Sequence, residues 1–529
     1  MLSNVKTYGV LGIKSFQIDV ETNISRGIPE FDIVGQGDVS IKESRVRVRT
    51  AIKNSGYDFP DGKIAVNLAP AALRKEGTFL DLPIAVGILC AAGNIKCECI
   101  KQCAIIGELS LSGEIRPIEG MLIRLTQAVM DGAKNAIVPW ENGHEAMLVR
   151  ECNIFPVKNL IETVTVLNSI TSDSKGVSMG NVGINGNFEE CTPVVSSVNT
   201  YENVEDFSDI KGQYQARRGM EIAACGGHNI LLAGAPGCGK TMLGRRFAGI
   251  LPPLTDSEAY EVTGVYSLAR LLPRGRGLMR NRPFRVISPG ITKTALIGGG
   301  RPLIPGEISL AHNGVLFMDE MTEYDSSLIQ LLRQPLERRS LLVSRLGYSQ
   351  CLPTDFIFVG AANPCKCGKY FEGNCTCTPN QIRASLSRIS KPILDRIDLH
   401  VPMKRIPFDD INSPDSSECS SVIRERVIKV REYQLDRYKG ENISLNAHLT
   451  GADIKKYCTL DRDCKKLIGK ATETMGLSVR AYDKILKIAR TIADMEFSDS
   501  IKVNHVAEAI QYRTFDNLFT EKNDMGRKL

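Results

Sequence analysis

The chain has 529 residues, of which 43% are hydrophobic and 24% charged, and its mean hydropathy is −0.10. These proportions are typical of a globular protein of about three domains, and they exclude a disordered chain, a collagen and a coiled-coil rod. No run approaches the roughly 18 uncharged apolar residues that span a bilayer, and the N-terminus lacks the pattern of a signal peptide, so we expect a cytoplasmic protein without a membrane partner.

The net charge of +6 is unevenly distributed. Residues 1–168 carry 18 Lys and Arg against 19 Asp and Glu, whereas residues 204–529 carry 47 against 37. This basic excess in the C-terminal two thirds is consistent with a polyanionic partner. Sixteen cysteines would be many for disulfides in the cytosol, and most of them, such as Cys90, are predicted to be small buried hydrophobic residues.

The pattern along the chain predicts an α/β multidomain protein. A stretch rich in Ser, Gly, Asn and Thr, residues 169–203, is predicted to be a flexible linker. It separates an N-terminal domain, 1–168, from a central domain, 204–411. After a polar break near 412–418 the chain is predicted to form a helical C-terminal domain, 412–529. In the N-terminal domain we expect strands at 16–22 and 63–68 and helices at 40–55, 82–92 and 121–130.

An apolar strand, a glycine-rich turn and a helix start follow one another in residues 230–241. This is the phosphate-binding loop of nucleotide-binding proteins in its required strand–loop–helix context. Lys240 is predicted to neutralise the β- and γ-phosphates of ATP, and Thr241 to offer its hydroxyl to Mg²⁺. The loop residues predicted to bind the nucleotide are Gly234, Ala235, Pro236, Gly237, Cys238, Gly239, Lys240 and Thr241.

Polar residues end two further apolar strands. Asp319 and Glu320 follow the strand at 314–318, where Asp319 suits Mg²⁺ and Glu320 suits the orientation of the attacking water. Asn363 ends a third strand, and its amide is placed to contact the γ-phosphate or that water. This order resembles that of AAA+ ATPases. The resemblance implies that Arg396 is a finger offered to a neighbour's ATP and that Arg480 is the second sensor, acting in cis.

The segment 340–356 predicts a β-hairpin, in the place where an AAA+ ring inserts its pore-facing hairpin. Arg345 and Tyr348 near its tip are candidates to touch a phosphate and a base face. Two further basic stretches are 274–282 and 298–301. Each alone is typical of a solvated loop, but with the basic C-terminal region they favour a nucleic-acid partner.

Four cysteines gather directly after Asn363. They are Cys365, Cys367, Cys375 and Cys377. Four thiols on one turn-rich loop can close a tetrahedral Zn²⁺ site, although the pairs have one intervening residue where two to four are usual. A loop of reduced thiols is the alternative.

Several motifs make the chain resemble the magnesium-chelatase-like AAA+ proteins and, among them, the ComM/YifB family. These are Asp209-Ile-Lys-Gly-Gln, Gly226-Gly-His-Asn, Leu251-Pro-Pro-Leu-Thr, Ala362-Asn-Pro-Cys-Lys-Cys-Gly and Leu394-Asp-Arg-Ile-Asp-Leu-His. The resemblance implies a homo-hexameric DNA helicase acting on branched or single-stranded DNA in natural transformation, with recombination proteins among its partners. Two loops depart from the family pattern. The usual His-His turn is absent at Ser288 and Pro289, and the segment 35–38 differs.

The N-terminal domain also resembles the Lon-protease fold, most closely at 107–120. That chemistry needs a serine nucleophile and a lysine base. The aligned positions hold Asp81 and Leu122, so we expect the fold without the catalytic dyad and without protease activity.

Two functions from different classes remain open. The first is an ATP-dependent DNA helicase that catalyses branch migration. The second is a remodelling ATPase of the magnesium-chelatase type, which acts on a protein partner without DNA. Stimulation of ATP hydrolysis by DNA, with a steep dependence on salt, discriminates between them.

Overall fold

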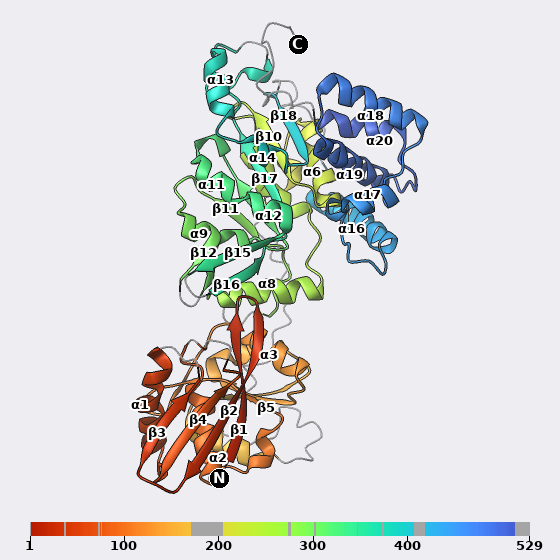
Figure 1. Cartoon of the computed structure of the whole chain (residues 1–529). Helices are drawn as coiled ribbons and strands as arrows, with labels where there is room; N and C mark the ends of the chain where they lie inside the picture. The colour runs from red at the N-terminus through yellow and green to blue at the C-terminus, as the bar shows by residue number, and fades with distance from the viewer. Residues whose placement is uncertain are drawn as a thin grey trace.

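The computed structural model describes residues 2–35, 39–71, 75, 77–170, 205–272, 277–300, 303–345, 348–372, 375–406 and 418–513. It has an N-terminal body, a central body built on a sheet, and a group of helices beside the central body (Figure 1). The predicted linker at 169–203 and the polar break near 412–418 lie almost entirely outside the described residues, as does most of the divergent segment 35–38. The domain limits there remain predictions.

The N-terminal body contains a seven-stranded sheet with the order β3-β4-β2-β1-β5-β8-β9. Its strands are β1 (Leu2–Leu11), β2 (Lys14–Ser25), β3 (Glu30–Val34), β4 (Lys63–Ala69), β5 (Cys103–Ile105), β8 (Asn135–Pro139) and β9 (Asn153–Val157). β1, β2 and β4 pair antiparallel, and the remaining pairs are parallel. The predicted strands at 16–22 and 63–68 are confirmed as parts of β2 and β4.

Helices cover both faces of this sheet. They are α1 (Val39–Asn54), α2 (Asp81–Ala91), α3 (Met121–Met130), α4 (Gly143–Ala146) and α5 (Leu160–Ser169). Successive residues of a strand point to opposite faces, so in β5 Cys103 and Ile105 pack with α1, α2 and α5, whereas Ala104 packs with α3 and α4. The predicted helices are confirmed as α1, α2 and α3. Short elements complete the body: β6 (Glu108–Leu109), β7 (Ile115–Arg116), η1 (Cys97–Ile100) and η2 (Trp140–Asn142).

One cysteine of this body differs from its prediction. Cys90 is buried near the end of α2, as expected of a small hydrophobic residue, but it is disulfide-bonded. Among the cysteines that the structure describes, twelve others are free thiols. The burial of Cys90 was predicted correctly, but its disulfide was not, because apolar periodicity carries no information about pairing between thiols.

The central body is built on a parallel five-stranded sheet with the order β11-β14-β17-β10-β18. These strands are β10 (Ile230–Gly234), β11 (Phe284–Ile287), β14 (Val315–Met318), β17 (Ile357–Ala362) and β18 (Leu399–Met403). Parallel strands buried on both faces are continuously apolar, and every residue of β10, β14 and β17 is buried. The order places β17 between β10 and β14, so the ends of these three strands meet at one edge.

Short helices and two small hairpins surround this sheet. The helices are α6 (Tyr214–Gly226), α7 (Lys240–Arg246), α8 (Asp256–Leu268), α9 (Lys293–Ile297), α10 (Glu307–Leu310), α11 (Ser326–Leu331), α12 (Arg333–Arg338), α13 (Pro379–Leu386) and α14 (Lys391–Leu394). The 3₁₀ turns are η4 (Phe207–Asp209), η5 (Phe247–Ile250), η6 (Met321–Glu323) and η7 (Tyr370–Glu372). The hairpins pair β12 (Gly298–Gly299) with β13 (Ile304–Pro305), and β15 (Ser340–Arg345) with β16 (Tyr348–Pro353).

The C-terminal described residues, 418–513, are helical, as predicted. They form α16 (Ser420–Arg437), η8 (Asn446–His448), α17 (Gly451–Tyr457), α18 (Arg462–Met475), α19 (Val479–Met495) and α20 (Val503–Gln511). Their apolar faces do not form a separate core. Ile485 and Ile488 of α19 belong to the same buried cluster as Ile230 and Leu232 of β10. The helices therefore pack directly on the nucleotide-loop side of the central sheet.

The N-terminal body contacts the central body through α8 (Figure 1). The Tyr260 hydroxyl donates to the Leu148 carbonyl at 3.0 Å. The Ser267 hydroxyl accepts from the Gly120 N–H at 3.0 Å and donates to the half-buried Glu145 carboxylate at 2.5 Å. Within the described part of the chain, no helix has the length and hydropathy needed to cross a membrane.

Candidate functional site: the phosphate loop and its neighbours

The phosphate loop leaves β10 and turns into α7. Gly237 and Gly239 have φ angles of 78° and 93°, in the left-handed region where a glycine has no steric penalty. The Lys240 ammonium donates to the carbonyls of Gly234 at 3.0 Å and of Ala235 at 2.6 Å. Burial lowers the pKa of this lysine. A bound phosphate group would therefore replace these carbonyls with its own oxygens as partners of the ammonium. Its negative charge would then balance the positive charge of Lys240.

Thr241 and Asp319 meet at the edge of the sheet. The Thr241 hydroxyl donates to Oδ2 of Asp319 at 2.6 Å, although 78 residues separate them in the chain. Oδ1 of the same carboxylate accepts the Glu320 N–H at 2.9 Å. A hydroxyl and a carboxylate at this spacing are a ligand pair suited to Mg²⁺ with bound phosphates.

Glu320 has an unusual backbone. Its φ of 49° lies in the left-handed region, which costs a non-glycine residue of order 1–3 kcal/mol and is often found at active sites. The residue is exposed, whereas the preceding strand β14 is fully buried. This conformation turns the chain sharply after Asp319. As a result the Asp319 carboxylate contacts Thr241, whereas the adjacent Glu320 is exposed.

Asn363 follows β17, between the ends of β10 and β14. Its side-chain oxygen is buried and has no hydrogen-bond partner within the described structure. The backbone carbonyl of the same residue accepts from the Ser385 hydroxyl at 3.3 Å. The sheet order thus brings the predicted residues Lys240, Thr241, Asp319, Glu320 and Asn363 to one edge.

The two predicted arginines converge elsewhere. Arg396 is 7% exposed, forms an ion pair with Glu337 of α12, and donates to the Pro392 carbonyl at 2.6 Å. Arg480, at the start of α19, lies 4.0 Å from the same Glu337 carboxylate and has a largely exposed side chain. Both arginines, which are 84 residues apart in the chain, are therefore held near one carboxylate. Sequence inspection had not singled out Glu337, which lies on a short helix without a recognisable motif.

A buried polar network lies beside Arg396, and it was also missed. The Asp398 carboxylate accepts from Lys484 of α19 at 2.7 Å and from the Asn229 N–H at 2.9 Å. Burial opposes ionisation of Asp398, but the nearby charge of Lys484 outweighs it and holds the pKa well below its ordinary value. The network links the segment that carries Arg396 to helix α19 of the C-terminal region. Asp398 belongs to the motif Leu394-Asp-Arg-Ile-Asp-Leu-His, but nothing in the sequence pairs it with Lys484.

The candidate nucleic-acid segments are only partly described. β15 and β16 confirm the predicted hairpin, with Arg345 paired to Tyr348 along the backbone. The side chains of these two residues, and Arg274 and Arg301 of the other basic stretches, lie outside the described parts of the structure. Arg282 forms an ion pair with Glu258 at 2.9 Å and donates to the Asn313 carbonyl at 2.7 Å. Its guanidinium is therefore engaged in holding the fold together.

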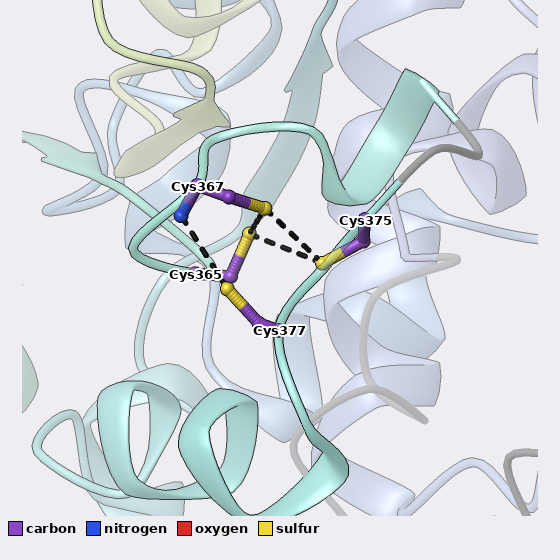
Figure 2. Close-up of side chains that lie close together, drawn as sticks. All are labelled: Cys365, Cys367, Cys375 and Cys377. Atoms are coloured by element: carbon purple, nitrogen blue, oxygen red, sulfur yellow. Dashed lines mark hydrogen bonds between the residues drawn. The ribbon is translucent and has the colours of Figure 1, made fainter.

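The four cysteines come together in a single cluster (Figure 2). The sulfur of Cys367 lies 3.4 Å from that of Cys365 and 3.4 Å from that of Cys375, and all four sulfurs lie within 4.8 Å of one another. The Cys367 N–H donates to the Cys377 sulfur at 3.4 Å. Zn–S bonds of about 2.3 Å in a tetrahedron place sulfurs about 3.8 Å apart, so the observed spacing fits one Zn²⁺.

The positions aligned with a protease dyad have structural roles. Asp81 is fully buried at the start of α2 and accepts from Nε of Arg47 at 2.8 Å. Leu122 is buried in α3. Neither side chain can act as a serine nucleophile or a lysine base. The absence of protease activity stays a prediction from the sequence.

Comparison with known families agrees with this geometry. Residues 206–411 match the family described as magnesium chelatase, subunit ChlI, residues 20–142 match subunit ChlI of Mg-chelatase, and residues 417–513 match its C-terminal part. The chain is 39% identical to YifB of Salmonella typhimurium, over 98% of each chain. It is 37% identical to competence protein ComM of Haemophilus influenzae, over 99% of this chain and all of that one.

A magnesium-chelatase 67 kDa subunit from Chlorobaculum parvum is 28% identical, over only 30% of the chain. The likeness to YifB and ComM thus spans the N-terminal body, the ATP site and the C-terminal helices together, whereas the likeness to that chelatase subunit is partial. The family implies ATPase activity, with ATP and Mg²⁺ as cofactors. The chain belongs to the magnesium-chelatase-like AAA+ ATPases, in the group that contains ComM and YifB.

Proposed function

We propose that the protein is an ATP-driven DNA helicase that acts as a hexameric ring in branch migration. The observation that carries the motor function is the 2.6 Å contact between Thr241 and Asp319, with Glu320 turned out beside them. The DNA part rests on three supports: the full-length likeness to a competence protein, the basic excess of residues 204–529, and the hairpin β15–β16.

Each residue at the sheet edge has a defined task in this proposal. Lys240 compensates the β- and γ-phosphates, and Thr241 and Asp319 hold Mg²⁺. Glu320 orients the attacking water. The unpartnered amide oxygen of Asn363 accepts a hydrogen bond from that water, because a carbonyl oxygen is an acceptor.

The two arginines act from outside this edge. Arg396 reaches the ATP of the adjacent subunit, and Arg480 senses the nucleotide of its own subunit as the helical region, 412–529, closes as a lid. Glu337 holds both arginines before these contacts form. The N-terminal domain, 1–168, has a Lon-like fold without protease activity and contributes to assembly or DNA contact, and 169–203 links it flexibly to the central domain, 204–411. Recombination proteins in the cytoplasm are the expected partners.

Branched DNA should stimulate ATP hydrolysis by the full-length protein. We expect stimulation to fall steeply between about 50 and 200 mM salt, because displacement of counterions from DNA dominates such binding. The measurement is phosphate release with and without a DNA junction at several salt concentrations. ATP hydrolysis indifferent to DNA at every salt concentration would instead favour the protein-remodelling function.

We also propose that Cys365, Cys367, Cys375 and Cys377 hold one structural Zn²⁺ per chain. The sulfur spacing, and the Cys367 N–H that donates to the Cys377 sulfur, support it. Elemental analysis of protein purified without added metal should find about one equivalent of zinc, and the double variant Cys365→Ser, Cys377→Ser should lose it. Cys103→Ser plus Cys464→Ser, two buried cysteines outside the cluster, is the matched control. Zinc far below one equivalent in the unmodified protein would contradict the site.

A further inference from the structure

We infer that the cysteine loop, residues 365–377, braces the phosphate loop, so that Zn²⁺ at the four sulfurs controls the affinity for ATP. The inference rests on the zinc site proposed above and extends it to the nucleotide site. The two loops come from the ends of adjacent strands, β17 and β10, which explains how segments more than 120 residues apart come into contact.

Gly368 makes the contact between the two loops. It is buried and has a φ of 74°. A Cβ added at this position would lie 2.5 Å from Cδ of Pro236 and 3.4 Å from Cα of Ala235. The backbone of the cysteine loop is therefore packed against two of the residues that surround the phosphates, with no room for a side chain between them.

The same turn gathers the sulfurs. The Gly368 N–H donates to the Cys365 carbonyl at 3.2 Å, closing the turn that carries Cys365 and Cys367. The turn that would hold the metal is thus the turn that touches Pro236. A change in the position of Cys367 moves Gly368 with it, since Gly368 directly follows Cys367 in the chain.

Among the described residues, the cysteine loop has only a small apolar cluster of its own, together with an ion pair between Glu372 and Arg405 at 3.3 Å. Its buried cluster consists of Cys365 with Ile382 and Leu386 of α13, and the other three cysteines and Tyr370 are only partly buried. So small an apolar cluster contributes little to stability, and segments of this kind commonly depend on a bound metal. Zn²⁺ would link the two ends of the loop, since Cys365 and Cys367 lie at its start and Cys375 and Cys377 lie at its end.

Loss of the metal should therefore release Gly368 from the phosphate loop. Backbone N–H groups bind phosphate well only when the loop holds them in a fixed arrangement. In catalysis, a misplacement of about 1 Å can lower the rate by about 100-fold. We expect the affinity for nucleotide to fall by about tenfold or more when zinc is removed. The sulfurs are protonated by solvent as the metal leaves, and no other group need change.

The test measures equilibrium binding of a fluorescent ATP analogue to the full-length protein. Binding is compared before zinc removal by a strong chelator, after it, and after zinc is restored, with elemental analysis at each stage. We expect the dissociation constant to rise about tenfold or more on removal and to recover on restoration. Far-UV circular dichroism should change little, because the loop is short.

Gly368→Ala tests the contact with Pro236 without changing the four cysteines that would bind the metal. The added methyl group meets Pro236, so nucleotide binding should weaken by about tenfold although one equivalent of zinc is retained. Gly440→Ala is the matched control, because Gly440 has a similar φ of 87° and nothing within 4 Å of its added Cβ. This control should leave nucleotide binding unchanged.

The outcomes are distinguishable. One equivalent of zinc together with a dissociation constant that neither chelation nor Gly368→Ala alters would overturn the bracing role and leave the zinc site intact. Absence of zinc would overturn both. A protein that binds zinc but no nucleotide in any state would overturn the proposed motor function.

Discussion

Glu320→Gln should reduce ATP hydrolysis by roughly 10²–10⁴-fold while ATP binds with near wild-type affinity. Glu320 itself adopts a left-handed backbone conformation and is exposed. In the proposed site, phosphate and Mg²⁺ are held by Lys240, Thr241 and Asp319 instead. Glutamine keeps the size of the side chain but cannot accept a proton from water. The measurements are phosphate release and equilibrium nucleotide binding on the same preparation.

Two further variants serve as comparisons for the Glu320→Gln result. Lys240→Ala should abolish productive ATP binding, because no other cation is seen at the loop carbonyls in the described structure. Glu323→Gln, three residues beyond Glu320 and exposed in η6, should leave both quantities unchanged. Wild-type hydrolysis by Glu320→Gln would show that another group orients the water.

Arg396→Ala should bind ATP nearly normally and hydrolyse it roughly 10³–10⁵-fold more slowly, the range measured for arginine fingers in P-loop enzymes. The Arg396 guanidinium is paired with Glu337 in its own chain and is 7% exposed. It must exchange this ion pair for the γ-phosphate of the adjacent subunit. The phosphate carries more charge than one carboxylate, so the exchange is favourable once a ring has formed.

Mixing inactive variants tests whether Arg396 acts in trans. Arg396→Ala supplies an intact phosphate loop, and Lys240→Ala supplies an intact arginine, so a mixed ring regains both groups at some interfaces. Partial recovery of hydrolysis is expected on mixing. Arg383→Ala, which removes an exposed arginine of α13, is the control and should stay active alone. No recovery despite demonstrated co-assembly, with a lowered melting temperature of Arg396→Ala, would assign Arg396 a structural role.

The nucleotide loop could be predicted from sequence because its chemistry is local. Backbone turns at Gly237 and Gly239, the lysine and the hydroxyl follow one another within a few residues, and the apolar strand before them is continuous. The strand ends Asp319 and Asn363 were predictable for the same reason, since a polar residue after a buried strand is visible in the sequence. The gathering of the four cysteines was likewise predictable, because one short loop carries them all.

Contacts between distant segments could not be predicted in this way. The pairing of Arg396 with Glu337, of Asp398 with Lys484, and of Gly368 with Pro236 joins residues from different elements. Cys90 belongs to this group, because its burial was predicted and its disulfide was not. Arg282 lies in a basic stretch that favoured nucleic acid, yet its ion pair with Glu258 is internal.

The amino-acid sequence by itself determined the helices and strands named in advance, the phosphate loop and the family to which the chain belongs. These depend on periodicity and on short motifs, which are properties of neighbouring residues. The tertiary structure decided the order of the strands, the shared core of β10 and α19, and the partners of the buried charges. A buried charge or a glycine contact is set by what packs against it, and that partner is chosen by the fold as a whole.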